Sequence, residues 1–479
     1  MSSALKQDVK RGLAWSSLGK LVTQLFTWLS TFFVIRFLTP NDYGIIEICI
    51  AIISFSFVLS EGGLADSIVR YKELTPKFLK EVFTVSILLN VFFYLIIWVT
   101  SPLVASFFNV DNLTTVLRVV ALQLPISSFF IVPLGKLRLD MDFKSIAVID
   151  GIVGVTNAII TFLCAYNGMG YWALVYGTLG ANIVKAIMLN IKTKIPYGLT
   201  TRLEEIKNVS SFSIYTVISR VLWVIFNKLD VIIVGRVLGV VALGVYSVAL
   251  QIAALPLIKV ASIINQISFS AYAKVSNEVD KVRYYFLLTS KLLALVSFPV
   301  FFGIAALAPL FVPLFFGEKW LDSIVPMQIF AFIVPFRVQV LSCQAMFQGI
   351  GKPKINSKNL VVGIFLISLG LLIGSNAGIV GTAIGWVSAF FIYFFVVVFN
   401  VAKQLKIDIN HYIINVVIPL IFASIMWLAV SFFPTLDIFI NSFVEILVKV
   451  FIGASLYITL LLMFGKKRYI LPLLSFLKK

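Results

Sequence analysis

Long apolar segments, each bounded by a few polar or turn-forming residues, repeat along almost the whole chain. Fourteen of them are about 20 residues long or longer, which is the length that an α-helix needs to cross roughly 30 Å of hydrocarbon. They centre on residues 13–38, 45–69, 82–108, 113–135, 145–166, 171–191, 210–238, 243–272, 285–316, 322–348, 358–374, 379–402, 412–433 and 438–464. The pattern predicts an all-α integral membrane protein with fourteen transmembrane helices.

Charge and composition support this interpretation. The 479 residues are 60% hydrophobic and 13% charged by type, and the formal net charge is +18. When the 39 Lys and Arg residues are assigned to alternating loops, 27 fall on one side, 11 lie within spans and Lys319 alone lies on the other side. Since positive loops stay in the cytoplasm, both termini are predicted to be cytoplasmic. The charge therefore reflects topology, and a nucleic-acid partner is not expected.

The chain has few residues suited to chemistry at a reactive centre. Its three cysteines lack metal-ligand spacing, and the single histidine, His411, lies in a predicted cytoplasmic loop. There is no nucleotide-binding loop, metal motif or Ser/His/Asp set. The sequence therefore predicts a protein that is not an enzyme and that has no cofactor and no metal site.

An internal repeat appears when the chain is offset by 200 residues. Val34, Arg36, Leu38 and Gly44 then match Val234, Arg236, Leu238 and Gly244. Each repeat contains six spans, and because six is even, both copies enter the membrane in the same direction; this predicts two parallel six-helix lobes. The predicted divisions are an N-terminal lobe at 1–192, an amphipathic cytoplasmic linker at 193–209, a C-terminal lobe at 210–404, and an appended helix pair with a basic tail at 405–479.

Two segments at corresponding points of the repeats carry a family resemblance. RFLTPNDYG at 36–44 and DVIIVGRVLGVVALGVYSVA at 230–249 resemble signature segments of polysaccharide transporters. These are the O-antigen and exopolysaccharide flippases of the multidrug/oligosaccharidyl-lipid/polysaccharide exporter superfamily. The resemblance covers the whole chain, and its motifs are specific to the family but not to one sugar. It implies transfer of a polyprenyl-pyrophosphate-linked oligosaccharide from the cytoplasmic to the outer leaflet, with polysaccharide polymerase machinery as a candidate partner.

Charged residues inside the spans are candidates for the binding site, because each costs several kcal/mol at the bilayer centre unless protein, water or headgroups receive it. Eleven cations and six acids lie in spans, an excess of five positive charges that would attract a pyrophosphate or an acidic sugar. The residues assigned to a cationic substrate cavity are Lys228, Lys259, Arg337, Arg220, Lys20 and Lys291. For each of the mid-depth cations, an ion pair with an acid on a neighbouring helix remains the alternative. Lys449, on the appended pair, is expected to face lipid or to have a packing role.

Arg36 and Arg236 lie near the outer ends of the first and seventh spans and define the outer lip of each lobe. From that depth an arginine side chain can reach water or lipid phosphate, or can hold the outer loop in place. Both roles are favoured over a position in the wall of the cavity. Among the acids, Asp230, Glu61 and Asp66 are candidates for ion coupling or gating. A static salt bridge at each is the competing interpretation.

Three classes of function remain open at this point. The first is the flippase in the cytoplasmic (inner) membrane, working by alternating access. The second is a cation-coupled multidrug or small-molecule exporter of the same superfamily, and the third is an integral-membrane glycan polymerase or ligase. The excess of intramembrane cations argues against the second, and the short outer loops, without histidine, argue against the third.

Overall fold

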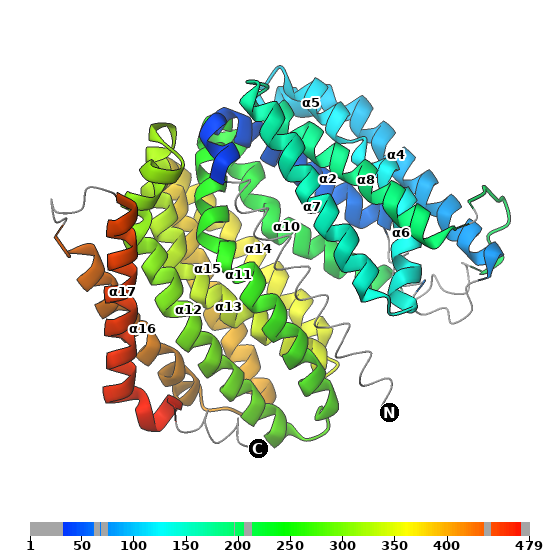
Figure 1. The fold of residues 1–479 in the computed structure, drawn as a ribbon. Helices are drawn as coiled ribbons and strands as arrows, with labels where there is room; N and C mark the ends of the chain where they lie inside the picture. The colour runs from blue at the N-terminus through cyan, green and yellow to red at the C-terminus, as the bar shows by residue number, and fades with distance from the viewer. Residues whose placement is uncertain are drawn as a thin grey trace. The chain divides into compact units, whose positions relative to one another are not determined.

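The computed structural model describes residues 32–61, 68, 75–195, 197–205, 213–434 and 442–470. Within these ranges the side chains of residues 61, 213–217, 257–271, 466–467 and 470 are not described. The chain divides into two compact units, Met1–Gly244 and Val245–Lys479. The described part of both units is built from helices and contains no strand (Figure 1).

In its described residues the first unit holds seven helices and the start of an eighth. They are α2 (Pro40–Glu61), α4 (Pro76–Phe108), α5 (Leu113–Val120), α6 (Gln123–Leu139), α7 (Phe143–Tyr166), α8 (Trp172–Thr193), α10 (Ser213–Val237) and the first residues of α11 (Val240–Lys274). In this unit α4, α6, α7 and α8 pack one beside the next, and α10 packs against α2 (Figure 1). The first unit thus includes α10, which belongs to the second sequence repeat. The lobe boundaries given above stay a prediction.

The second unit continues from α11 and contains the remaining elements. They are α12 (Val279–Phe315), the 3₁₀ turn η1 (Glu318–Ser323), α13 (Ile324–Gly349), α14 (Pro353–Ser375), α15 (Gly378–Leu405), α16 (Ile409–Ser431), α17 (Ser442–Leu460) and the π-helical segment η2 (Leu461–Ile470). Helix α12 contacts α13, α16 and α17, while α14 packs on α15. Glycines bring those two backbones together, because a Cβ on Gly370 would lie 2.3 Å from the Gly385 carbonyl oxygen.

Local sequence signals set the helix ends. Thr75 precedes α4 in an extended conformation, and its hydroxyl accepts a hydrogen bond from the Phe78 amide at 3.0 Å. Pro76 follows at the first helical position, where the missing amide hydrogen is not needed. The same helix ends at Asn109, which adopts the left-handed conformation with φ 55°.

The polarity of α4 is opposite to that of a helix on a water-soluble protein. Leu88, Phe92 and Val99 are 61%, 56% and 66% exposed. Asn90 is completely buried, and its amide nitrogen donates to Ser86 and, at 3.1 Å, to Ser128 on α6. Apolar side chains outside and hydrogen-bonded polar side chains between helices are what a lipid environment favours.

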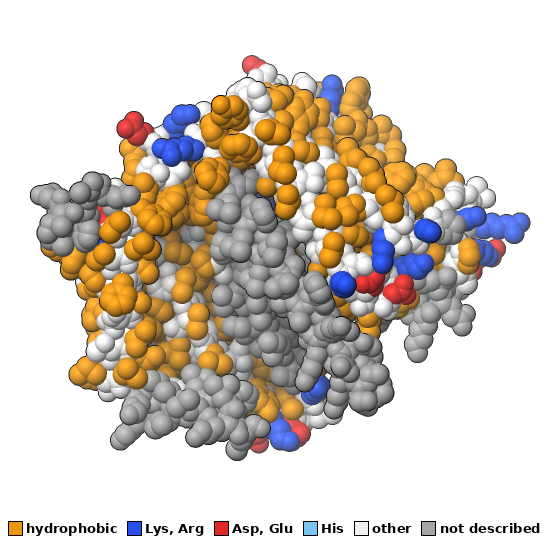
Figure 2. Space-filling model, in the orientation of Figure 1, with side chains coloured by type: hydrophobic (Ala, Val, Ile, Leu, Met, Phe, Trp, Pro, Cys, Tyr) orange, Lys and Arg blue, Asp and Glu red, His pale blue; other side chains and the backbone are white. Residues whose placement is uncertain are grey.

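Eleven helices in the described part of the chain are long and apolar enough to cross a membrane. Figure 2 shows hydrophobic side chains covering the middle of the helices, with Lys, Arg, Asp and Glu gathered toward their ends. The all-α, multi-pass membrane architecture is therefore confirmed. The total of fourteen transmembrane helices stays a prediction, because residues 1–31 and several short segments lie outside the described part. The grouping of the helices into two six-helix lobes also stays a prediction.

Candidate functional site

An ion pair joins α10 to α2 in the first unit. The Lys228 ammonium lies 3.0 Å from Glu47 Oε2, and the two side chains are 26% and 15% exposed. The two residues are separated by 181 positions in the sequence. An ammonium has three N–H donors, so an anion can approach Lys228 while Glu47 still accepts from it. This is the alternative that the sequence left open for Lys228, an ion pair with an acid on a neighbouring helix.

Asp230 lies on α10 two residues after Lys228. At that spacing on a helix the two side chains point to nearly opposite sides. It is buried, with 7% of its surface exposed, and its Oδ1 accepts a hydrogen bond from the Val231 amide at 2.9 Å. Its assignment to ion coupling stays a prediction.

The two arginines of the outer lip have different surroundings, although they match in the repeat. Arg236 donates to the Phe107 carbonyl oxygen at 2.7 Å and lies 5.2 Å from the centre of the Phe107 ring. It thereby attaches the end of α10 to the last turn of α4, where free carbonyls and the negative end of the helix dipole attract a cation. Arg36 is exposed. The structure shows that Arg236 holds the end of α10 against α4. The assignment of Arg36 and Arg236 to an outer lip stays a prediction.

A reciprocal backbone contact connects the two repeats close to the Lys228–Glu47 pair. A Cβ on Gly44 would lie 1.9 Å from the Val240 carbonyl oxygen, and a Cβ on Gly244 would lie 1.8 Å from the Pro40 carbonyl oxygen. Because Pro40 and Gly44 are matched in the 200-residue offset by Val240 and Gly244, each repeat presents its glycine to the other's carbonyl. Only glycine permits so close an approach.

Two cations of the second unit that the sequence assigned to the cavity, Arg337 and Lys291, lie against aromatic rings. Arg337 lies 5.2 Å from the centre of the Trp386 ring, on neighbouring helices α13 and α15. Lys291 Nζ lies 6.0 Å from the centre of the Tyr469 ring. Such contacts place a cation over a region of negative potential. Their assignment to a substrate cavity remains a prediction.

Four candidate residues lie wholly or partly outside the described residues. Lys20 and Asp66 belong to segments that the structure does not describe. Glu61 ends α2 and Lys259 lies on α11, and the side chains of both are outside the described set. Arg220 lies on α10 and is half-buried.

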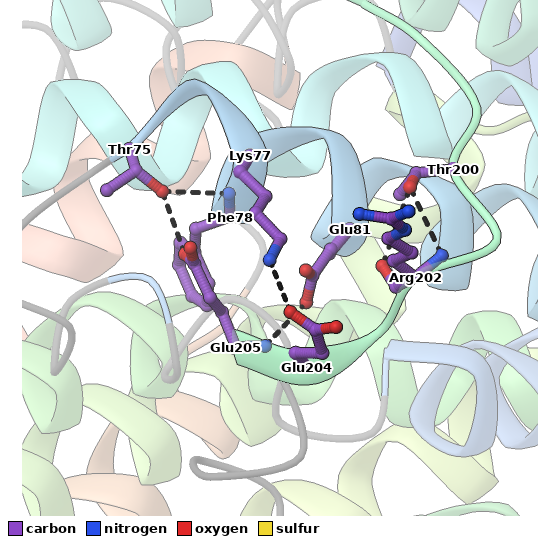
Figure 3. Close-up of polar contacts among 8 residues, drawn as sticks. All are labelled: Thr75, Lys77, Phe78, Glu81, Thr200, Arg202, Glu204 and Glu205. Carbon is purple, nitrogen blue, oxygen red and sulfur yellow. Dashed lines mark hydrogen bonds and ion pairs between the residues drawn. The ribbon is translucent and has the colours of Figure 1, made fainter.

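A polar cluster at the start of α4 was missed by sequence analysis (Figure 3). Glu81, completely buried, accepts a hydrogen bond from the Glu205 amide at 2.9 Å. Thr75 donates to Glu205 Oε2 at 2.8 Å, and Lys77 pairs with Glu204 at 2.5 Å (Figure 3). The linker that follows α8 is thus attached to α4 by side chains at the first turn of that helix. The sequence signal for this cluster was Glu81, which directly precedes the apolar window at 82–108. Hydropathy assigns a charged residue at that position to a loop.

The electrostatics of this linker cluster follow from its exposed ion pair. The hydrogen bond from Lys77, reinforced by its charge, lowers the pKa of the Glu204 carboxyl below the ordinary value of 4.5. Nearby, burial raises the pKa of Tyr197 to about 12. Its hydroxyl donates to the Phe129 carbonyl oxygen at 3.1 Å and its ring lies 4.7 Å from that of Phe83. Together these contacts hold residues 197–205 on the first unit.

In the described part of the chain, no three His, Cys, Asp or Glu side chains are close enough together to hold a metal ion. The polar features described above are ion pairs, cation–aromatic contacts and backbone contacts.

Comparison with known proteins identifies the family. The model of a family described as polysaccharide biosynthesis protein matches residues 33–325. The chain belongs to this family. Its members include the kind of transporter that the RFLTPNDYG segment resembles, and the match includes both the α2–α10 ion pair and the reciprocal glycine contact.

Two relatives and one solved structure are consistent with this assignment. An uncharacterised membrane protein in the cps region of Klebsiella pneumoniae is 25% identical over 95% of each chain. The lipopolysaccharide biosynthesis protein WzxC of Escherichia coli is 23% identical over 80% of this chain and 78% of its own. The lipid II flippase MurJ, in an inward closed conformation, superposes with a TM-score of 0.77 over 94% of this chain and 99% of its own at 16% identity. At that identity the likeness to MurJ shows a shared fold.

Proposed function

We propose that this polysaccharide biosynthesis protein is a flippase that moves a polyprenyl-pyrophosphate-linked oligosaccharide from the inner to the outer leaflet of the cytoplasmic membrane. It works by alternating access between two six-helix lobes, with an appended helix pair completing fourteen spans. Both termini lie in the cytoplasm. The product supplies surface polysaccharide biosynthesis, with polymerase machinery as the next acceptor.

The single observation that supports this function most is the reciprocal contact of Gly44 with Val240 and Gly244 with Pro40. Because each repeat presents its glycine to the other's carbonyl, the contact supports a pseudo-twofold relation between the repeats, as in transporters that rock one repeat against the other. A backbone contact of this kind can open without breaking an ion pair of its own. In this proposal the two repeats part here during the transport cycle, and the nearby Lys228–Glu47 pair opens with them.

The chemistry of the cargo fits the α2–α10 ion pair. A sugar diphosphate brings charge and many hydroxyls into hydrocarbon, where both cost several kcal/mol unless they are received by polar partners. Lys228 is half-buried and has donors to spare beside Glu47. In this proposal Lys228 contacts the diphosphate together with Arg220, Arg337, Lys259 and Lys20, while the original assignment of Lys291 to the same cavity is replaced below. Asp230, Glu61 and Asp66 take part in gating or ion coupling.

The experiment is deletion of the gene, followed by analysis of surface polysaccharide and of the lipid-linked precursor. The expected result is loss of one surface polymer and accumulation of its polyprenyl-linked unit on the cytoplasmic leaflet, reversed by the wild-type gene. Unchanged surface glycans together with reduced dye efflux would establish the multidrug exporter instead. Accumulation of the single unit on the outer leaflet would indicate a polymerase or ligase.

A further inference from the structure

Two cations lie together in the second unit without an acidic partner in the described part of the chain. Lys291 extends from α12, and its Nζ is 6.0 Å from the centre of the Tyr469 ring on η2. Arg468, directly before Tyr469, acts on Lys291 electrostatically. Both side chains are half-buried. Two like charges in such surroundings repel each other, and an anion between them would relieve that repulsion.

The segment that carries Arg468 is held in a fixed position. The Arg468 guanidinium donates twice to Asn415 Oδ1 on α16, at 3.0 and 3.3 Å. The Tyr469 hydroxyl donates to the Ile414 and Asn415 carbonyl oxygens at 3.4 and 3.2 Å. Arg468 therefore stays beside Lys291 because its own contacts place it there.

Asn415 adds a third donor. It is completely buried, and its amide nitrogen has no acceptor among the described residues, although its oxygen is used by Arg468. A buried donor left without an acceptor is unfavourable, and a bound acceptor would relieve that cost. A phosphate has oxygens for an ammonium, a guanidinium and an amide at once, and arginine in particular suits its geometry.

The position of the site favours a lipid as the source of the phosphate. Lys291 is twelve residues from the start of α12, or about 18 Å along a helix. Arg283 on the same helix donates to the Leu405 carbonyl at 2.9 Å, at the end of α15. The site thus lies about three turns inside the start of α12 and about two turns beyond the level of the α15 end. The segment GKKRY directly after the last span adds further cations. Basic residues that flank a span attract anionic headgroups.

We propose that Lys291, Arg468 and Asn415 form a binding site for the phosphate of an anionic phospholipid, at the end of the second unit where α12, α16 and η2 meet. The bound lipid attaches the appended helices α16 and α17 to α12. The site does not depend on the cargo of the transporter. In this proposal Lys291 binds a lipid that stabilises the fold and does not contact the transported lipid.

The test uses the purified full-length chain in detergent, with binding of phosphatidylglycerol measured by native mass spectrometry. Diacylglycerol with the same acyl chains is the phosphate-free comparison. The variant Lys291→Met should bind phosphatidylglycerol about tenfold more weakly, since one charge-assisted contact is lost. Lys291→Arg, which keeps the charge, should bind as the wild type does. Lys281→Met removes an exposed lysine of the same helix, paired with Glu278 at 2.7 Å, and should also bind as the wild type does.

The outcomes separate the possible sources of phosphate. Retention of phosphatidylglycerol in the presence of excess inorganic pyrophosphate supports the lipid headgroup. Displacement by pyrophosphate, with both ligands lost in Lys291→Met, supports the same site with a soluble anion as its ligand. Equal binding by wild type and Lys291→Met, or an equal loss in Lys281→Met, overturns the proposal. Since Lys291→Met can also affect folding, the rise in melting temperature on adding phosphatidylglycerol is measured for each variant, and only the wild type, Lys291→Arg and Lys281→Met should show it.

Discussion

Two ion pairs inside the helical bundle differ in what they connect. Lys228 and Glu47 come from different helices and are 26% and 15% exposed. Lys449 and Glu445 are four residues apart on α17, 3.0 Å from each other, and are 8% and 11% exposed. The first pair opens when α2 and α10 move apart, whereas no movement between helices can open the second. The first is therefore suited to a transport cycle and the second to holding α17 in place.

The surroundings of Lys449 explain why a charge pair is buried there. Glu445, Lys449, Gly453 and Tyr457 recur at intervals of four residues and form the buried stripe of α17. Tyr457 donates to the Leu295 carbonyl oxygen on α12 at 3.0 Å, and Gly453 lets α16 approach closely. The opposite face carries Leu447 and Phe451, which are 53% and 73% exposed. The stripe is a packing surface, in agreement with the packing role considered for Lys449.

The largest effect is expected from Lys449→Met. It leaves the Glu445 carboxylate buried without its partner, which costs about 3 kcal/mol for a desolvated pair. The melting temperature of the purified protein should fall by several degrees, and the amount of protein in the membrane should fall with it. Export per molecule of surviving protein should not change. A large loss of export at normal protein levels would contradict the distinction between the two pairs.

A smaller effect is expected from Gly44→Ala. The new Cβ would lie 1.9 Å from the Val240 carbonyl oxygen, and relieving such overpacking costs about 1–3 kcal/mol. The shift separates α2 from the start of α11, one turn of α2 away from Glu47, the partner of Lys228. Gly303→Ala is the matched control, because the nearest atom to its Cβ, Met426 Cε, is 4.0 Å away. Equal stability and equal export of the two variants would contradict the importance of the glycine contact.

The smallest effect concerns the exposed pair of Lys77 and Glu204, whose contribution water screens. Because the pKa of Glu204 is lower in the folded protein, its contact is present above pH 4.5 and is lost as the pH falls through the folded pKa. The protection of the residue 200–205 amides, taken as hydrogen exchange relative to the intrinsic rate at each pH, should therefore fall as the pH drops below 4.5. Lys77→Met should abolish this loss of protection without lowering the melting temperature. Protection that stays constant with pH in the wild type would contradict the assignment.

Hydropathy predicted the helices well because membrane insertion depends on local composition. The window at 82–108 lies within α4, and the window at 322–348 lies within η1 and α13. The window at 113–135 was less accurate, since a turn at Ala121–Leu122 divides it into α5 and α6. Pro125, in the first turn of α6, is the local signal of that turn, and a hydropathy average does not register it.

The candidate site was less predictable, because contacts between distant residues leave no local pattern. The sequence identified Lys228 as an intramembrane charge, but not Glu47 as its partner 181 residues away. The offset of 200 residues matched Gly44 with Gly244 and gave no sign that each contacts the other repeat. The pairing of Lys449 with Glu445, by contrast, follows from helical spacing alone.

The most direct test of the central claim measures the lipid-linked unit exposed on the outer surface of cells that carry Lys228→Met. Lys185→Met is the control, because Lys185 also forms an ion pair within the first unit, 3.2 Å from Asp150. The account predicts that Lys228→Met reduces outer-surface exposure toward the level of the deletion strain at normal protein levels, while Lys185→Met behaves as the wild type. Wild-type exposure in Lys228→Met, or an equal loss in both variants, would contradict it.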